Sequence, residues 1–233
     1  MSDFIQLGYL VSAVLFILGL RGLARPRTAV RGNQLGALGM LVAVVVTLTD
    51  QRIVGYGTLA VGLVLGTVVG ALLATRVQMT GMPQLVALFN GFGGAGSLLV
   101  AAAGFLEALD AGDPEVQTSA GTATALAVGS VTLSGSIVAF AKLQELVSGG
   151  ANASPVLRTI NIALAVAAVG LGVGLIIDPG RWWLWALVAT ALVLGVTLVA
   201  PIGGADMPVV IALLNSLSGL AASAAGFILD NSL

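Results

Sequence analysis

The sequence contains no cysteine and no histidine, and few of its side chains carry a charge or an aromatic ring. Without cysteine the chain has no disulfides and no thiolate metal sites. Charged residues make up 8% of its 233 residues, whereas a soluble globular domain has about 25%. The net charge of −1, with no basic cluster, argues against nucleic-acid binding. These absences exclude a soluble domain, a disulfide-stabilised domain and a DNA- or RNA-binding protein.

Apolar residues and glycine are abundant instead, with 58% hydrophobic residues and 32 glycines. A transmembrane helix needs about 20 mostly apolar residues. The apolar runs are continuous rather than alternating, which favours helices over barrel strands. We therefore predict an all-α, polytopic membrane helix bundle that forms a single domain over residues 1–233. Its eight predicted transmembrane helices are 3–20, 33–49, 54–74, 83–106, 119–140, 158–177, 182–200 and 208–229.

The lysine and arginine residues predict the orientation, because cytoplasmic loops carry the excess of these residues. With the N-terminus outside, the inner loops carry seven of them and the outer loops carry only Arg52 and Arg181. The acidic segment 107–115 then lies outside, and Trp182, Trp183 and Trp185 lie in the outer interface, where aromatic residues gather. We predict an extracytoplasmic N-terminus.

Two stretches of the sequence resemble each other at a shift of 125 residues. The segment 82–90 begins with Met-Pro and ends in Asn90, and the segment 207–215 begins with Met-Pro and ends in Asn215. Gly94 and Gly219 follow their asparagines at i+4, on the same helix face. The match predicts a parallel four-plus-four repeat of helices.

The two asparagines are the first candidate functional residues. Each lies seven residues past its proline, about 10 Å into its helix, where lipid offers an amide no hydrogen bond. We therefore expect both to face the interior of the bundle. Gly94 and Gly219 then allow helices to pack closely, or they let water in. An alternative is that the asparagines serve only helix packing, as small and polar stripes often do.

Two further positions complete the candidate site. Asp206 precedes the last helix, where a carboxylate can cap free amides and face the positive end of the helix dipole. The matching residue is Gly81, so only one of the two helix starts carries a charge. Ser136 belongs to a group of hydroxyl residues on the fifth predicted helix, with Ser130, Thr132 and Ser134, although serine can also bond its own helix backbone.

The sequence lacks the groups that break bonds. No acid, base or histidine lies in the middle of a predicted span, and an amide takes up no proton near neutral pH. There is no metal cluster, no nucleophile–base pair and no nucleotide fingerprint, because the glycines at 91–96 lie inside a membrane helix. We expect this chain to have no catalytic residues and to bind no cofactor.

Six segments match a known family: Arg31–Asn33, Met79–Ala87, Leu133–Leu143, Gly203–Val210, Leu214–Ser216 and Ala224–Phe227. They resemble the beta-subunit membrane domain of proton-translocating NAD(P) transhydrogenase. The segments around Asp206 and Ser136 are the most specific, and the resemblance runs from the first helix to the end.

The resemblance implies a bacterial inner-membrane complex in which soluble domains pass hydride from NADH to NADP while the membrane domain conducts the coupled proton. It implies that Asn215 and Ser136 lie on the proton path and that Asp206 gates its cytoplasmic mouth. At the position of Asn90 many members carry a histidine proton carrier. Others have asparagine there, and a histidine of an alpha-type membrane subunit takes its place; this sequence fits the second kind. The implied partners are alpha-type subunits, the NADP-binding domain, the lipid membrane and a second copy of the complex as a homodimer.

The sequence departs from the family pattern at its end. Members have a ninth helix and then an NADP-binding domain, and neither follows the eighth helix here. Two alternatives to the proton-conducting function stay open. A small-solute secondary transporter would suit an internal repeat, although no intramembrane charge is available for coupling to an ion. A structural membrane subunit would need neither asparagine.

Overall fold

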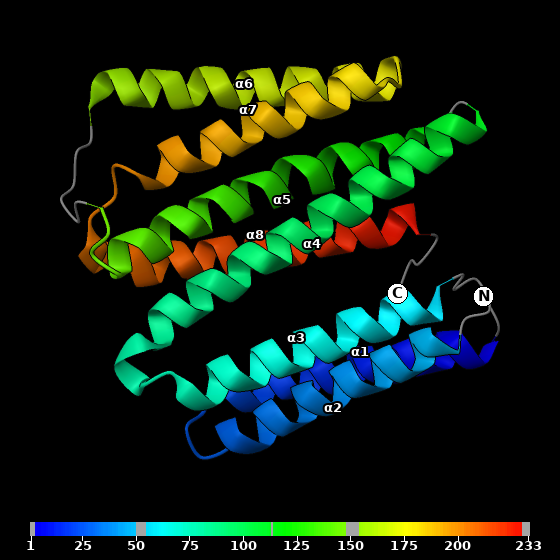
Figure 1. Cartoon of the computed structure of the whole chain (residues 1–233), viewed down its shortest axis with the longest axis vertical. Coiled ribbons are helices and arrows are strands. Elements are labelled where there is room, and N and C mark those ends of the chain that lie inside the picture. The colour runs from blue at the N-terminus through cyan, green and yellow to red at the C-terminus, as the bar shows by residue number, and fades with distance from the viewer. Residues whose placement is uncertain (1–2, 50–54, 113, 148–153, 230–233) are drawn as a thin grey trace. The chain divides into compact units, whose positions relative to one another are not determined.

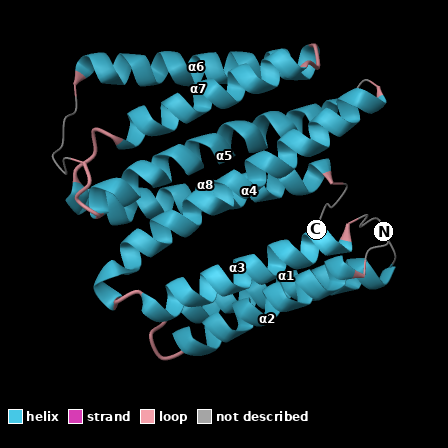
Figure 2. Cartoon of the chain, viewed as in Figure 1, coloured by secondary structure: helices cyan, strands magenta, loops and turns pink. Residues whose placement is uncertain are grey.

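The computed structural model describes residues 3–49, 55–112, 114–147 and 154–229, and these form α-helices joined by short connections (Figures 1 and 2). Two short 3₁₀ turns are the other regular elements, η1 (Met79–Gly81) and η2 (Gly204–Asp206). The helices are α1 (Asp3–Leu23), α2 (Ala29–Leu48), α3 (Tyr56–Arg76), α4 (Met82–Ala111), α5 (Val116–Leu143), α6 (Pro155–Ile177), α7 (Arg181–Val199) and α8 (Met207–Ile228).

All eight helices are long and apolar enough to cross a membrane. The predicted all-α class is therefore confirmed, and the predicted spans agree with the helices to within a few residues. The largest differences are at α4 and α5, which have 30 and 28 residues. A prediction based on apolar runs stops at the first polar residue, whereas hydrogen bonding continues a helix through residues such as Glu107 and Gln117. The chain is a multi-pass membrane protein.

The helix starts support the predicted repeat. The starts of α2, α3 and α4 at Ala29, Tyr56 and Met82 correspond to those of α6, α7 and α8 at Pro155, Arg181 and Met207. The shifts are 126, 125 and 125 residues. Helices α1 and α5 do not share this spacing, because α5 begins earlier in its half. The repeat is therefore visible in the helix boundaries of three of the four pairs.

The chain divides into two compact units, residues 1–72 and 73–232. In the first unit α1 packs against α2 through glycines that bring the two backbones close together. A Cβ on Gly32 would lie 2.6 Å from the carbonyl oxygen of Gly19. The Ser12 hydroxyl donates to the Gly39 carbonyl at 2.7 Å. Helix α3 has no buried residue.

Helix α5 is the centre of the second unit, where it packs against α4, α6, α7 and α8 (Figure 1). Small residues line the contacts. Gly195 of α7 approaches Val131 and Ser134 of α5, and Gly121 of α5 approaches Ala224 of α8. A helix surrounded by other helices leaves few positions open to water or lipid, so a buried polar group on α5 needs a partner on its own backbone or on a neighbouring helix.

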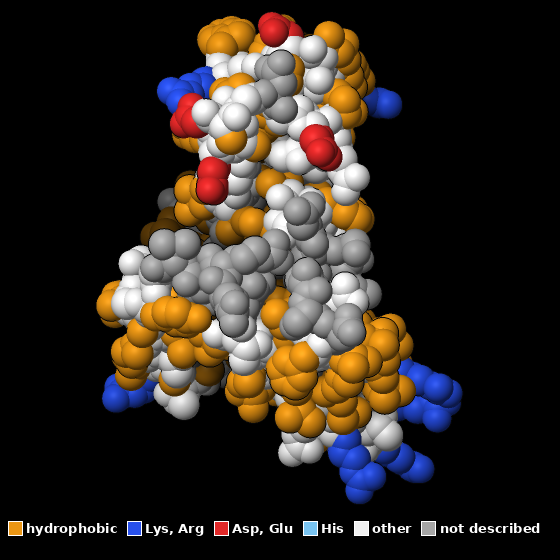
Figure 3. Space-filling model, turned by 90° about the vertical axis from the view of Figure 1, so that its right-hand side faces the viewer, with side chains coloured by type: hydrophobic (Ala, Val, Ile, Leu, Met, Phe, Trp, Pro, Cys, Tyr) orange, Lys and Arg blue, Asp and Glu red, His pale blue; other side chains and the backbone are white. Residues whose placement is uncertain are grey.

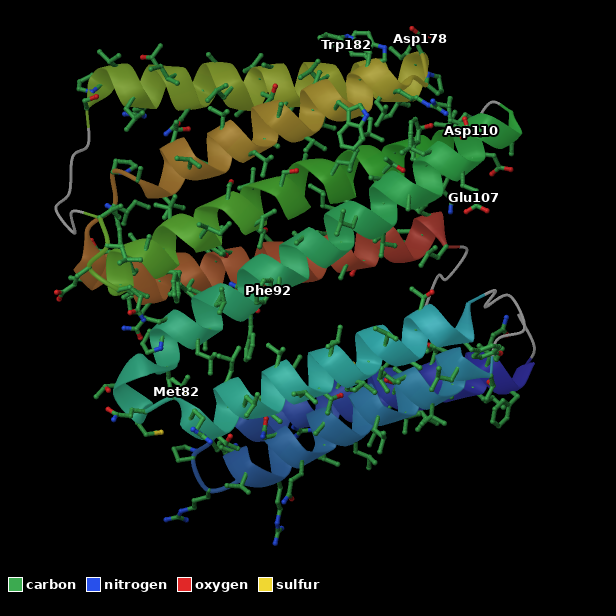
Figure 4. The ribbon with its side chains drawn as sticks, viewed as in Figure 1. Met82, Phe92, Glu107, Asp110, Asp178 and Trp182 are labelled. Carbon is green, nitrogen blue, oxygen red and sulfur yellow. The ribbon has the colours of Figure 1, made fainter. Side chains whose placement is uncertain are left out.

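The second unit has two chemically different ends. Glu107, Asp110 and Asp178 lie near one end, with Trp182 beside them, and Met82 lies at the other end (Figure 4). Figure 3 views the molecule from this side and shows acidic side chains among hydrophobic and uncharged ones. The opposite end, which we call the Lys142 end, comprises the C-termini of α5 and α7 and the N-termini of α4 and α8.

An ion pair joins Arg181 at the start of α7 to Asp110 near the end of α4. The two side chains are 60% and 65% exposed, so solvent screens their attraction. We expect Arg181→Ala to change the free energy of unfolding by less than about 1 kcal/mol, measured by denaturation of the purified protein in detergent. A decrease in the free energy of unfolding of several times that size would mean that the ion pair is shielded from solvent.

Candidate functional site

The two Met-Pro helix starts have the same backbone geometry. Gln78 and Gly203 are extended, with φ/ψ of −71°/156° and −68°/151°. A 3₁₀ turn follows each, and Gly81 and Asp206 at its end have φ/ψ of −90°/1° and −91°/−3°. Each proline then occupies the first helical turn, where its missing N–H costs nothing. The sequence repeat is therefore also a structural repeat at these two sites.

Helices α4 and α8 lie side by side in the second unit and run in the same direction. Asn90 contacts α8 at Ile211, and a Cβ on Gly93 or Gly104 would meet Ser218 or Ile228. The contacts thus advance along both helices together. Parallel packing brings the two matched segments next to each other.

Asn90 is buried, with 5% of its surface exposed. Its Nδ2 donates to the carbonyl oxygen of Ile211 at 3.0 Å. That carbonyl lies four residues before Asn215, so in an α-helix it also accepts the backbone amide of Asn215. The side chain of one repeat is therefore bonded to the helical turn that carries the asparagine of the other.

Glycines let α4 approach α5 beside Asn90. A Cβ on Gly94 would lie 2.7 Å from the carbonyl oxygen of Gly129, and one on Gly129 would lie 2.8 Å from the carbonyl oxygen of Gly94. A Cβ on Gly91 would lie 3.3 Å from the Cβ of Ser136. Ser136 is thus placed against α4 one residue after Asn90.

Five buried hydroxyl groups on α5 have no hydrogen-bond partner among the described residues: Ser119, Thr122, Ser130, Thr132 and Ser136. Each of the five residues has an exposed fraction of 0%. They extend over 17 residue steps, about 26 Å of helix, which is close to the roughly 30 Å of the hydrocarbon core. The hydroxyls therefore extend over most of the length of a membrane crossing.

Other hydroxyls of this chain behave differently. Several donate to the carbonyl four residues earlier in their own helix, which is the usual solution for serine and threonine in a helix. They are Thr47, Ser97, Thr124, Ser134, Thr159, Thr197 and Ser223. A buried hydroxyl without a partner costs about 1–3 kcal/mol, so the five on α5 call for partners such as water.

Within the second unit, Asn90 faces the interior as expected, whereas Asn215 lies on a face that the unit leaves uncovered. Asn215 is exposed on α8, and its side chain makes no hydrogen bond to a described residue. The reason is that α8 packs mainly against α4 and α5 in its unit, so part of its surface stays uncovered.

The two predicted packing glycines differ in the same way. Gly94 is buried between α4 and α5, whereas a Cβ on Gly219 would meet no described atom within 4 Å. Gly219 is exposed and contributes no close helix contact to its unit. The two helix starts therefore have the same backbone conformation but different neighbouring residues.

Asp206 is exposed and, contrary to our expectation, its carboxylate accepts no capping hydrogen bond. The backbone explains the difference. A capping side chain needs an extended N-cap residue, but Asp206 ends a 3₁₀ turn in the α region. The carboxylate has no partner among the described residues and lies at the Lys142 end, beside the positive end of the α8 dipole.

Sequence reasoning missed Ser119 and Thr122, which extend the hydroxyl group toward the start of α5, as well as Gln84 and Lys142. Gln84 Nε2 donates to the carbonyl of Leu143 at 3.2 Å, and its Oε1 is buried without a partner among the described residues. The hydroxyl at nearly every turn of α5 was a usable signal. The tertiary contacts of Gln84 and Lys142 had no signal in the sequence.

The described residues hold no group of acidic, histidine or cysteine side chains able to bind a metal. The site can therefore supply hydroxyls, amides and carbonyls. Such groups accept and donate hydrogen bonds, but they take up no additional proton near neutral pH.

Comparison with known proteins identifies the family of the chain. The model of the NAD(P) transhydrogenase beta subunit family matches residues 5–233. The chain belongs to this family. Two curated sequences of NAD(P) transhydrogenase subunit beta from Rhodospirillum rubrum, one of them assigned to a specific strain, are each 40% identical to it over 235 residues. The match covers 97% of the chain and 50% of each relative, so the chain spans about half the length of these transhydrogenase subunits.

Proposed function

We propose that this chain is the proton-conducting membrane part of an NAD(P) transhydrogenase, which couples proton translocation to hydride transfer from NADH to NADP in separate soluble domains. The partnerless hydroxyls of α5 are the observation that carries the proposal. They are buried, they lie along one helix over most of a membrane crossing, and family membership supports the reaction to which they would contribute.

Hydroxyl groups suit a path rather than a binding site for protons. A hydroxyl can accept one hydrogen bond and donate another at the same time. A chain of hydroxyls and water can therefore pass a proton along without any member carrying the charge for long. The five hydroxyls of α5, with water between them, form such a chain.

Asn90 orders the end of this path that Ser136 marks. Its amide bridges α4 and α8 at the level where Ser136 meets Gly91, so it holds the helices that enclose the water. Asn215 is on the exposed side of the next turn of α8, where an amide inside a membrane needs a partner. We infer that another subunit covers this face and contributes the group that binds the proton.

This inference defines the partners. An alpha-type subunit supplies the titratable group at the face of Asn215, and the soluble domains hold NAD and NADP. The complex is a homodimer in a bacterial inner membrane. No cofactor is assigned to a residue of this chain.

The orientation assigns the two ends of the path. With an extracytoplasmic N-terminus, the Lys142 end faces the cytoplasm and Asp206 lies at the cytoplasmic mouth. The free carboxylate of Asp206 is then available to the NADP-binding domain, and it acts as the gate between that domain and the path.

The hydroxyl path can be tested by removing hydroxyls without changing side-chain shape. In the reconstituted complex we expect Thr132→Val together with Ser136→Ala to slow coupled proton pumping by about tenfold or more, since each lost hydrogen bond is worth about 1 kcal/mol. The readout is acidification of vesicles by a trapped pH dye.

Thr124→Val and Ser134→Ala are the matched controls, because these α5 hydroxyls already donate to their own helix. Equal slowing in the controls and in the test variant would contradict a path along the partnerless hydroxyls. Solute uptake by vesicles without nucleotides would instead favour a secondary transporter.

A further inference from the structure

Lys142 is a buried lysine in the last turn of α5, with 6% of its surface exposed. Its Nζ donates to two backbone carbonyls, that of Ala200 at 2.5 Å and that of Ile202 at 2.6 Å. Charge-assisted hydrogen bonds of this kind are about twice as strong as neutral ones. Burying an ammonium group is costly unless such partners satisfy it.

The two acceptors belong to the turn that connects α7 to α8. Ala200 is the C-cap of α7, where free carbonyls and the negative end of the helix dipole favour a cation. Ile202 is followed by Gly203 and then by η2, which ends in Asp206. Lys142 therefore ties the end of α5 to the segment that leads directly into Asp206.

An apolar cluster adjoins Ile202, one of the two residues whose carbonyls accept from Lys142. Ala87 of α4, Ala139 of α5, Val199 of α7 and Met207 of α8 are buried together in it, with Ile202 packed against them. Since the four helices meet here, a change in the turn 200–203 is transmitted to the start of α8.

The first repeat lacks the aspartate of this arrangement, because the position that corresponds to Asp206 at the shift of 125 residues is Gly81. Helices α1 and α5 do not follow that shift, and the last turn of α1 also carries a basic residue, Arg21. No ion pair joins Lys142 to Asp206 within the described residues, so Lys142 acts on Asp206 through the backbone between Ala200 and η2.

We propose that Lys142 is a positioning residue for Asp206: it fastens the turn 200–203 to α5 and so keeps η2 in register with the helix that carries the hydroxyl path. Its role in proton coupling rests on the proposed function, whereas its effect on the position of η2 does not. We call the two hydrogen bonds from Lys142 to the turn the clamp. When the soluble domain displaces Asp206, the clamp transmits that displacement to α5 as well as to α7.

The absence of native cysteine makes a direct test possible. A single cysteine at Ala205 reports on η2, and one at Thr80 reports on the matching position of η1; both residues are exposed. Each is combined with Lys142→Met, which keeps the length of the side chain and removes its donors, or with Lys142→Arg, which keeps the charge and the donors. The readout is the rate at which a water-soluble maleimide modifies this chain, measured by mass in the assembled complex in detergent.

We expect Lys142→Met to accelerate modification at position 205 by about tenfold, as the loss of charge-assisted hydrogen bonds allows η2 to move. Lys142→Arg should restore most of the original rate, and position 80 should not change. An unchanged rate at position 205, an equal acceleration at both positions, or no restoration by arginine would each overturn the proposal.

Proton pumping measured on the same variants separates the two proposals. Faster modification at position 205 together with slowed pumping supports both. Faster modification with normal pumping keeps the clamp but removes Asp206 from the coupling, and so contradicts the proposed gate.

Discussion

Replacing Gly94 with valine should separate α4 from α5 and give a protein that unfolds far more readily than the original. The first added carbon would lie 2.7 Å from the carbonyl oxygen of Gly129 and 2.9 Å from the amide nitrogen of Leu133. Both are backbone atoms of a helix enclosed by its neighbours, so neither can move without the whole helix. Overpacking of this kind costs about 1–3 kcal/mol, and valine adds two further methyl groups.

Gly96→Val is the matched control for this prediction. Gly96 lies two residues further along α4, and a Cβ there meets nothing within 4 Å. The measurement is the midpoint of thermal unfolding of the purified protein in detergent. We expect a decrease for Gly94→Val and little change for Gly96→Val; equal midpoints would show that the two helices do not pack as described.

Substitution of Asn90 by leucine should abolish coupled proton pumping, with a decrease of about a hundredfold or more, while hydride exchange in the soluble domains persists. Leucine branches at Cγ as asparagine does, but it cannot donate to the Ile211 carbonyl. It also places an apolar group beside Ser136, where the proposed path needs water. A lost buried hydrogen bond and a disrupted water chain each contribute about 1–3 kcal/mol to the barrier.

Asn161→Leu provides the control, because Asn161 makes a comparable bridge on another pair of helices. Its Nδ2 donates from α6 to the carbonyl of Thr197 on α7 at 3.2 Å. Both variants lose one amide-to-backbone bond between helices, so their stabilities should fall to a similar extent. Normal pumping by Asn90→Leu, or its loss in both variants, would refute a specific role for Asn90.

The same measurement on Asn215→Leu tests the inferred partner. The side chain of Asn215 makes no hydrogen bond to a described residue of its own unit, so its substitution should leave the stability of the isolated chain unchanged. We nevertheless expect it to abolish pumping in the complete complex, where the partner's group lies against it. Full pumping in Asn215→Leu would remove Asn215 from the proton path.

The contrast between Asn90 and Asn215 shows how a repeat can divide its roles. The two helix starts have nearly the same backbone angles. However, the side chain of Asn90 bonds to α8, whereas the side chain of Asn215 has no partner among the described residues. Similarly, one start carries Asp206 and the Lys142 clamp, and the other carries Gly81. One repeat thus supports the bundle, and the other presents its polar groups to partners.

The sequence by itself determined the class of the protein, the eight membrane helices, the repeat of the Met-Pro helix starts and the family. These properties depend on local composition and spacing: an apolar run of about 20 residues needs a helix to satisfy its backbone in lipid, whatever its neighbours are. The same patterns predicted that Asn90 faces the interior and that Gly94 allows close helix packing. They did not predict which helices make these contacts or that α5 is the centre of its unit.

The tertiary structure alone decided which polar groups have partners. Asn90 and Asn215 occupy equal positions in similar sequences, but α5 and α8 enclose the first and no helix of the unit covers the second. Asp206 precedes a helix as a capping residue would, but it ends a 3₁₀ turn in the α region and its side chain makes no capping hydrogen bond. Burial and hydrogen bonding depend on residues distant in the sequence, as the bonds from Lys142 to Ala200 and Ile202 illustrate, and periodicity within one helix carries no information about them.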